Sequence, residues 1–466
     1  MTQILHYVYD AVAVVLLFGA AIFVHEFGHY WVARRRGLKV LEFAIGFGPK
    51  IFGWTRDGID YSVRWIPAGG YVKLPQMITS SAIEGEEGSQ EKIPPAPPFS
   101  KILVAVAGPF MNVVFAFAIA GVIYFVGLPV LVNPSIIGYV EPDSAEAKLG
   151  VREGDKIVAI NGKPVKSWQE VHAMTMVALT NVLPVTVERG AETLTFNLKA
   201  EPNEMIGLKM LNLNPRDHPV IKGIKSGSAA ESAHLQVNDE VIALAGVPIS
   251  SREQFVGLVQ KRGGEATPIV VKRGGQKVNL QVTPALDPGT KIGRIGVELG
   301  SSAKEVYQIE HPSPWSQIVN VWEQMVSTFS ALIHSRQSGV KASDLAGPVG
   351  IISSLAAQAH ADYRLALNFL VLLNINLALL NMLPVPVLDG GHILMAIIER
   401  IRRKPLSIRF VEYTTTAFAI LLLSFMLYVT FFDVKRLSLF RSMFKREVQI
   451  EQVEKPTGAP ATNSAQ

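Results

Sequence analysis

The chain has 466 residues, enough for several domains, but only 18% of them are charged and its mean hydropathy of +0.27 is high for a soluble protein. Lys and Arg outnumber Asp and Glu by only 44 to 39 and form no basic–aromatic patch, so nucleic-acid binding is not expected. Cysteine is absent, which excludes disulfides, thiol catalysis and thiolate metal sites, and leaves His, Asp and Glu as metal ligands.

Four apolar stretches predict membrane-spanning helices, because such a helix needs about 20 mostly apolar residues. They cover residues 7–33, 102–126, 363–389 and 410–432. A buried core helix is the alternative for each of them. The first stretch lacks a basic leader and a small-residue cleavage site, so we interpret it as a retained helix rather than a signal peptide.

The first stretch ends in three ionisable side chains, within the run FVHEFGHY. His25 and His29 are four residues apart and share one helix face, where both rings can reach one metal ion. Glu26 lies beside that site and can take a proton from an attacking water and pass it to a leaving amine. Chance is the alternative, but an unpaired ionisable group at membrane depth is costly and usually marks function.

Residues 40–75 predict a membrane-associated β-hairpin region, because β-branched and aromatic residues alternate there between turn signals at GFGP and RDG. An exposed strand edge can hold an unwound peptide backbone by β-addition. A purely structural hairpin is the alternative. The polar, proline-rich run EGEEGSQEKIPPAPP that follows predicts a linker.

A repeat with an offset of 84 residues lies between the second and third stretches, where Ser144–Ser167 aligns with Ser228–Ser251 without gaps. Each copy continues into a short helix and a predicted hairpin, across RGAE and RGGQ. The shared pattern resembles PDZ domains of bacterial periplasmic proteases, which take an extended peptide as an added strand. The resemblance implies two PDZ domains, at 128–202 and 203–287, that bind or screen peptides. Spacers without a working groove are the alternative.

Residues 310–360 carry an amphipathic stripe followed by the hinge-like run AGPVGI. The stripe consists of Trp315, Ile318, Trp322, Met325, Phe329 and Leu332. This region predicts either a mobile gate or a plain interfacial anchor.

The third stretch ends with NMLPVPVLDGGH, in which Asp389 is the only carboxylate. Pro384 and Pro386 interrupt the helix, and a broken helix is tolerated at membrane depth where it lines a protein-buried or watery cavity. A zinc ion with two His ligands needs a third protein ligand and keeps its fourth position open. Asp389 fits that role, with His392 as a rival.

Basic loops predict the orientation, because Lys and Arg concentrate on the cytoplasmic side. They follow the first stretch and lie between the third and fourth, at Arg34, Arg35, Arg36 and Lys39 and at Arg400, Arg402, Arg403 and Lys404. Both termini and the large 127–362 region are then periplasmic. The segment 433–466 is also basic at its start and predicts an interfacial amphipathic helix, with Leu437, Phe440 and Phe444, followed by a disordered tail.

These motifs, in this order, resemble the site-2 protease family of intramembrane zinc metalloproteases. The resemblance implies zinc held by His25, His29 and Asp389, with Glu26 as general base and acid. It also implies cleavage of single-span proteins of a bacterial inner membrane, near the cytoplasmic side. The expected substrates are an anti-sigma factor already trimmed by another protease, and remnant signal peptides.

Further candidates for substrate binding follow from the same resemblance. Asn381 matches the asparagine of the family motif NxxPxPxLDG, and Gly46, Phe47 and Gly48 match its GFG element. Asn112, after Gly108 and Pro109, is a candidate of the same kind. Ordinary interhelical hydrogen bonding is the alternative for both asparagines.

The predicted fold is a polytopic α-helical membrane protein with four transmembrane helices, a membrane-associated β-hairpin region, and two tandem α/β PDZ domains between helices two and three. Two other functions fit parts of the pattern: a membrane-anchored zinc protease acting on soluble peptides, and a non-catalytic PDZ adaptor with a structural metal. Glu26 argues against the adaptor, since a structural metal site needs no base.

Overall fold

The computed structural model describes residues 2–77, 96–131, 135–202, 208–287, 289, 292–301, 306–404, 406–436 and 449–450. The chain divides into two compact units. The first comprises residues 1–130, 309–329 and 341–448, and the second comprises residues 131–308, 330–340 and 449–466. The expected amphipathic helix around Leu437, Phe440 and Phe444 and most of the predicted linker lie outside the described residues.

Four described helices are long and apolar enough to cross a membrane, as predicted. They are α1 (Thr2–Arg35), α3 (Pro98–Val126), α11 (Tyr363–Asn381) and α13 (Ile408–Lys435). Their ends follow local chemistry. Pro98 begins α3, and Gly127 ends it with a φ of 80°. Asp362 and Ser407 cap the N-termini of α11 and α13 by accepting backbone N–H bonds.

The third predicted stretch, residues 363–389, contains one helix followed by the interruption expected at Pro384 and Pro386. Helix α11 ends at Asn381, and α12 runs from Asp389 to Arg402. Between them the chain passes through Pro384 and Pro386, neither of which can donate a helical hydrogen bond. The break places Asp389 in the first turn of a new helix.

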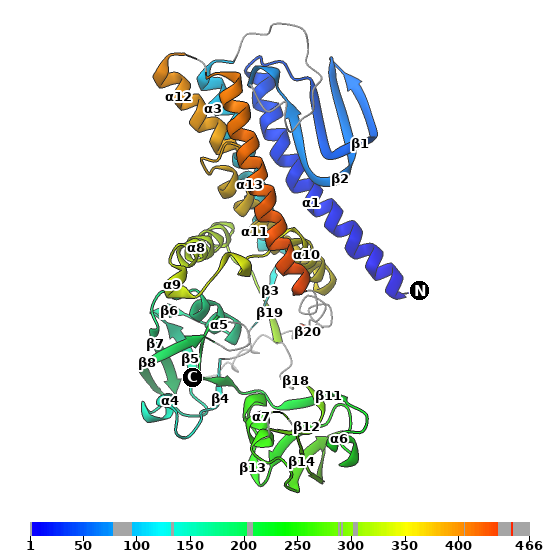
Figure 1. Ribbon diagram of the computed structural model, residues 1–466, viewed down its shortest axis with the longest axis vertical. Coiled ribbons are helices and arrows are strands. Elements are labelled where there is room, and N and C mark those ends of the chain that lie inside the picture. The colour runs from blue at the N-terminus through cyan, green and yellow to red at the C-terminus, as the bar shows by residue number, and fades with distance from the viewer. Residues whose placement is uncertain are drawn as a thin grey trace, which may run out of the picture. The chain divides into compact units, whose positions relative to one another are not determined.

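Helix α3 is central to the first unit, where it packs against α1, α11 and α12 (Figure 1). Small residues allow α3 to pack closely against its neighbouring helices. A Cβ on Gly28 of α1 would lie 2.4 Å from the carbonyl oxygen of Ala107 in α3. Ala21, Ala116 and Ala120 are fully buried in the shared core. Such small-residue contacts are typical of helices that associate in membranes.

The predicted hairpin consists of β1 (Glu42–Arg56) and β2 (Ile59–Lys73), which lie beside α1 (Figure 1). Asp57 and Gly58 both have positive φ, which suits the tight two-residue turn between the strands. The hairpin also folds back on itself, because residues 42–45 pair with residues 60–63 on one side and 70–73 on the other. The segment 70–73 is therefore an edge. The short helix η1 (Pro75–Met77) follows it.

The amphipathic region forms α8 (Pro314–Ile333), α9 (Ser335–Ser338), η2 (Ala342–Asp344) and α10 (Pro348–Ala361). In α8 the predicted stripe is split, with Trp315 and Trp322 exposed and Met325 buried. The start of α10 is held by Asp433 of α13. The fully buried Asp433 carboxylate accepts N–H bonds from Gly347 at 3.1 Å and Gly350 at 2.8 Å. A carboxylate at a helix N-terminus is favourable.

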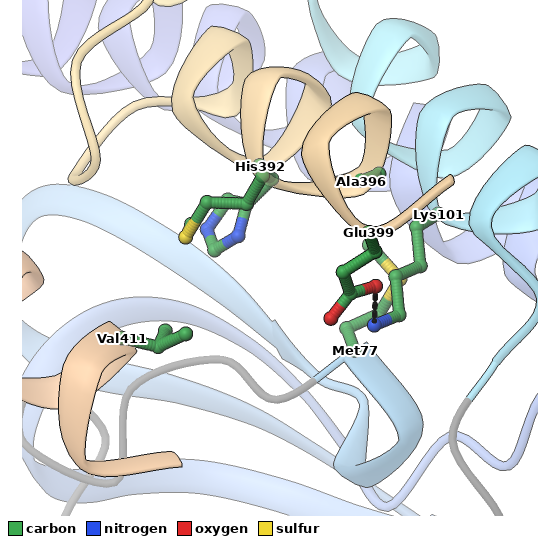
Figure 2. A pocket seen from close by; sticks show the side chains of 7 residues that line it. Met77, Lys101, His392, Ala396, Glu399 and Val411 are labelled. Atoms are coloured by element: carbon green, nitrogen blue, oxygen red, sulfur yellow. Dashed lines mark hydrogen bonds and ion pairs between the residues drawn. The ribbon is translucent and has the colours of Figure 1, made fainter. Parts of the chain in front are cut away.

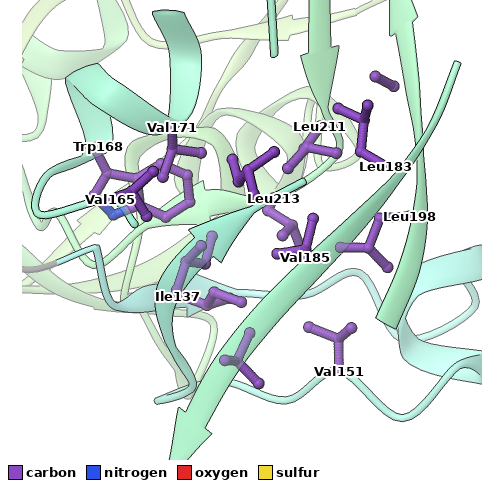
Figure 3. Close-up of a cluster of buried hydrophobic side chains, with 14 of the residues drawn as sticks. Ile137, Val151, Val165, Trp168, Val171, Leu183, Val185, Leu198, Leu211 and Leu213 are labelled. Carbon is purple, nitrogen blue, oxygen red and sulfur yellow. The ribbon is translucent and has the colours of Figure 1, made fainter. Parts of the chain in front are cut away.

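The second unit contains two domains of the same plan. The first has β4 (Ile137–Tyr139), α4 (Ala145–Lys148), β5 (Lys156–Ile160), β6 (Lys163–Pro164), α5 (Trp168–Met176), β7 (Val182–Arg189), β8 (Glu192–Pro202), β9 (Lys209–Leu211) and β10 (Asn214–Pro215). Its main sheet has the order β6-β5-β7-β8-β9. Figure 3 shows its core, in which Ile137 and Leu183 are fully buried.

The second domain has β11 (Pro219–Ile224), α6 (Ala229–Ser232), β12 (Glu240–Leu244), β13 (Val247–Pro248), α7 (Arg252–Gln260), β14 (Thr267–Arg273), β15 (Gln276–Val282), β16 (Ala285–Leu286), β17 (Gly293–Arg294) and β18 (Val297–Ser301). Its main sheet has the order β15-β14-β12-β11-β18, with β13 beside β12. Three further short strands are β3 (Leu128–Leu131), β19 (Val306–Glu310) and β20 (Gln449–Ile450).

The domain boundaries differ from the predicted 128–202 and 203–287. Leu211 and Leu213 belong to the core of the first domain, and β10 pairs with its β4, so that domain continues past residue 202. Strand β18 pairs with β11, so the second domain continues to Ser301. These closing strands carry none of the repeated motif, which is why the sequence pattern stops short of them.

Candidate metal centre

The structure brings His25, His29 and Asp389 together, although Asp389 lies about 360 residues after the histidines. The Nε2 atoms of His25 and His29 are 3.2 Å apart. The carboxylate oxygens of Asp389 lie 3.3 Å from His25 Nε2 and 3.4 Å from His29 Nε2. Among the described residues the rival His392 is not part of this group.

The turn before α12 depends on two glycines. A Cβ on Gly390 would lie 2.3 Å from the carbonyl oxygens of Met382 and Leu383, and one on Gly391 would lie 2.1 Å from that of Val385. Any side chain there must displace backbone. The tight turn brings Asp389 toward α1, so the glycines of LDGG serve packing at this site.

Residues of helix α3 contact the Nδ1 atom of each histidine, whereas the two Nε2 atoms face Asp389. The Nδ1–H of His29 donates to the Val104 carbonyl at 2.7 Å, and the amide of Asn112 lies 3.2 Å from His25 Nδ1. Gly108 lies between these contacts, where a Cβ would be 2.2 Å from His29 Nε2. Sequence reasoning missed Val104 and Gly108. Gly108 precedes Asn112 by four residues and so shares its helix face. That spacing is the one feature of the sequence that could have pointed to Gly108 as part of the site.

Glu26 lies between the metal-binding face of α1 and the β-sheet. Its side chain is only 8% exposed. A Cβ on Gly70, in the edge segment of β2, would lie 2.7 Å from Glu26 Cγ. The edge of the sheet therefore packs against the side chain of Glu26, the residue predicted to be the base.

The three candidate ligands fit zinc. Two imidazoles and one carboxylate are a common ligand set of catalytic zinc sites, and tetrahedral ligands at about 2.0–2.1 Å from zinc lie roughly 3.3 Å from one another. The separations of 3.2, 3.3 and 3.4 Å match that spacing. The Nδ1–H of His29 is used by Val104, which leaves its Nε2 lone pair for a metal. Asp389 Oδ2 is buried without a hydrogen-bond partner among the described residues.

The substrate-binding candidates lie in different places. Asn381 is the last residue of α11 and is half-buried. Gly46 and Gly48 have φ values of 90° and 82°, where β1 bends, and the ring of Phe47 stacks on Tyr71 with centroids 6.3 Å apart. The GFG element thus contacts the edge segment that reaches Glu26. Asn112, in contrast, is fully buried against His25.

A buried ion pair lies near the start of α3, as Figure 2 shows. Lys101 Nζ is 2.8 Å from Glu399 Oε2 of α12, and the other Glu399 oxygen accepts a bond from the Leu406 N–H. Both side chains are under 10% exposed. The rival ligand His392 lines the small cavity beside this pair, together with Met77. The pair ties the helix that begins with Asp389 to the helix that supports the histidines.

Two histidines and a remote aspartate, with a glutamate adjacent to one histidine, lie together among helices of membrane-spanning length, the arrangement that the motifs predicted for a membrane-embedded metallopeptidase. Residues 13–425 match the model of peptidase family M50, and the chain belongs to that family.

Named relatives align along nearly their whole length. The regulator of sigma-E protease RseP of Escherichia coli is 30% identical over 458 residues, 93% of this chain and 100% of the relative. A Salmonella typhimurium protein of the same name is 30% identical over 450 residues, 92% of this chain and 99% of the relative. A Neisseria meningitidis protein named "Putative zinc metalloprotease" is 33% identical over 446 residues, 89% of this chain and 96% of the relative. The chain is thus a zinc metalloprotease, as the motifs predicted.

Proposed function

We propose that this zinc protease cuts substrates inside the membrane, with zinc held by His25, His29 and Asp389 and with Glu26 as general base and acid. The observation that carries the proposal is the position of the metal-binding group. Two of its members lie on α1, a helix of membrane-spanning length and composition. Ionisable residues at such depth usually mark a functional site.

Zinc held by His25, His29 and Asp389 would act as a Lewis acid, which would polarise the scissile carbonyl and make water a better nucleophile. Glu26 lies beside the ligands on α1, largely shielded from solvent. It takes the proton of the attacking water and later delivers it to the leaving amine. The Val104 carbonyl holds the His29 ring by its Nδ1–H. These contacts keep the group arranged before a substrate arrives.

The substrate backbone is held at the edge of the β-sheet. A peptide bond in a spanning helix is shielded by its own hydrogen bonds, so the segment must unwind before it is cut. An unwound strand can pair with the edge segment 70–73, whose Gly70 lies against Glu26. Gly46, Phe47 and Gly48 support that edge through the Phe47–Tyr71 contact, and Asn381 binds backbone from the end of α11.

We interpret the two repeated domains as PDZ domains that bind or screen the extramembrane part of a substrate. A groove of about 470 Å³ in the second domain supports this role. It lies between α7 and residues 295–299 and is lined by apolar side chains, among them Phe255, Val259 and Ile295. A strand beside a helix is the arrangement that accepts an extended peptide.

The names of the relatives suggest the substrate class. Proteins named regulator of sigma-E protease align over nearly the whole chain. We therefore propose a single-span anti-sigma factor, trimmed beforehand by another protease, as the substrate, with remnant signal peptides as a second class. The enzyme lies in a bacterial inner membrane. The basic loops favour an orientation in which the repeated domains and both termini are periplasmic and the site lies toward the cytoplasm.

The test is cleavage of a model single-span substrate by the purified protein and by Glu26→Gln, with zinc measured in both. Glu26→Gln should bind zinc but lose at least about 100-fold in rate, because a general base contributes about 10²–10⁴-fold. Wild-type cleavage by this variant contradicts the assignment of Glu26. Cutting only outside the spanning segment indicates a protease of soluble peptides instead.

A further inference from the structure

We infer that Asn112 is a positioning residue for the zinc ligand His25, and that its amide oxygen accepts the Nδ1–H of that ring when the metal is bound. The inference rests on the metal site proposed above. It assigns to Asn112 a role different from the substrate contact expected from the sequence.

The side chain of Asn112 has one hydrogen-bond partner among the described residues, which is His25. Asn112 is 0% exposed, on the face of α3 that packs against α1. Its Nδ2 atom lies 3.2 Å from His25 Nδ1, and its Oδ1 atom is buried with no hydrogen-bond partner among the described residues. Only one end of the amide is bonded. Among the described residues, the His25 ring is therefore the only hydrogen-bond partner that can decide whether the nitrogen or the oxygen of the Asn112 amide faces the ring.

The two orientations of the amide correspond to two tautomers of His25. With Nδ2 toward the ring, Nδ1 must accept, so the ring proton lies on Nε2 and faces Asp389 Oδ2 at 3.3 Å. A protonated Nε2 cannot bind a metal. With Oδ1 toward the ring, Nδ1 donates and the Nε2 lone pair is free. Amide nitrogen and oxygen have nearly the same size, so this reversal displaces no neighbour.

The other histidine shows the arrangement that a metal requires. His29 donates its Nδ1–H to the Val104 carbonyl at 2.7 Å, and its Nε2 faces the same point as His25 Nε2. Both contacts come from one helix, at positions eight residues apart on the same face of α3. A ligand histidine held by an acceptor on its other nitrogen is the usual arrangement at zinc sites. We infer that Asn112 Oδ1 provides the corresponding acceptor for the Nδ1–H of His25.

The experiment measures zinc affinity of the purified full chain by chelator competition, and records the absorption spectrum after cobalt replaces zinc. Asn112→Leu keeps the volume but has no acceptor, so zinc affinity should fall about 10–100-fold, the usual effect of losing such a partner. Asn112→Asp offers only acceptor oxygens and should bind zinc at least as tightly as the wild type. Its cobalt spectrum should match that of the wild type.

Asn374→Leu is the matched control. Asn374 is also 0% exposed and its amide oxygen has no described hydrogen-bond partner, but its Nδ2 donates to the Leu370 carbonyl within α11 and not to a proposed ligand. Its zinc affinity should be unchanged. The inference is overturned if Asn112→Leu keeps wild-type zinc affinity and cobalt spectrum, even where cleavage falls, since that result indicates substrate binding. If Asn112→Leu does not fold, weakened zinc binding by Asn112→Asp overturns it.

His25→Ala, measured in parallel, tests the metal site itself. It should abolish stoichiometric zinc binding. If it does not, the proposed ligand set is wrong, and that failure is distinct from a failure of the Asn112 variants alone.

Discussion

The metal centre and the repeated domains are built in opposite ways. The candidate metal centre brings together residues of α1 and α12, which are hundreds of residues apart in the chain. A third helix, α3, approaches the histidines so closely that position 108 accommodates only glycine. Each repeated domain contains the same ion pair between residues 34 apart, Asp155 with Arg189 and Asp239 with Arg273. The site therefore has little steric tolerance, whereas the repeated domains share an ion pair between residues that are close in the chain.

Gly108→Ala should have the largest effect. The new Cβ would lie 2.2 Å from His29 Nε2, and the ring cannot move away without breaking its bond to Val104. A displacement of about 1 Å costs on the order of 100-fold in rate, so both zinc content and cleavage should collapse. Gly121→Ala is the control in the same helix, since its Cβ would meet nothing within 4 Å. Full zinc binding by Gly108→Ala would contradict the close packing.

Lys101→Met tests whether the buried pair links the two halves of the site. It leaves the Glu399 carboxylate buried without its cation, which should cost about 3–5 kcal/mol in the free energy of unfolding. The double variant Lys101→Met with Glu399→Leu should recover most of the loss, because an apolar pair of similar volume is often as stable. Thermal unfolding in detergent measures both. A single variant as stable as the wild type would show that the pair contributes nothing.

Arg189→Ala and Arg273→Ala probe the local contacts of the repeated domains. Each leaves a carboxylate that is 1% or 0% exposed without its partner. Because the arginines are 26% and 29% exposed, water can reach the vacated position, and the expected loss is smaller, about 2–3 kcal/mol. Hydrogen exchange should rise only in the domain that carries the change, with zinc binding intact. Faster exchange in both domains would show that they unfold together.

Local features of the sequence predicted much of this architecture. Apolar length identified the four membrane helices, the RDG run identified the turn at Asp57 and Gly58, and the offset of 84 residues identified two copies of one domain. The structure also brings together the three residues chosen as ligands. Each of these signals is carried by neighbouring residues or by a motif.

What the sequence did not predict depends on packing between distant segments. The contacts of Gly108 with His29, and of Lys101 with Glu399 across 298 positions, follow from how α3 meets its neighbours, which no local pattern encodes. The closing strands β10 and β18 were missed for a related reason, since they complete sheets begun far earlier in the chain. The contact of Asn112 with His25 of α1 was not predicted either, because no pattern in the sequence encodes it.

The separation of the ligands along the chain has a consequence for biosynthesis. A chain is made at about 5–20 residues per second, so Asp389 emerges on the order of tens of seconds after His29. During that interval α1 carries two histidines and a glutamate without the third ligand, and the break before α12 has not yet formed. The proposed zinc site is therefore complete only after most of the chain has been synthesised.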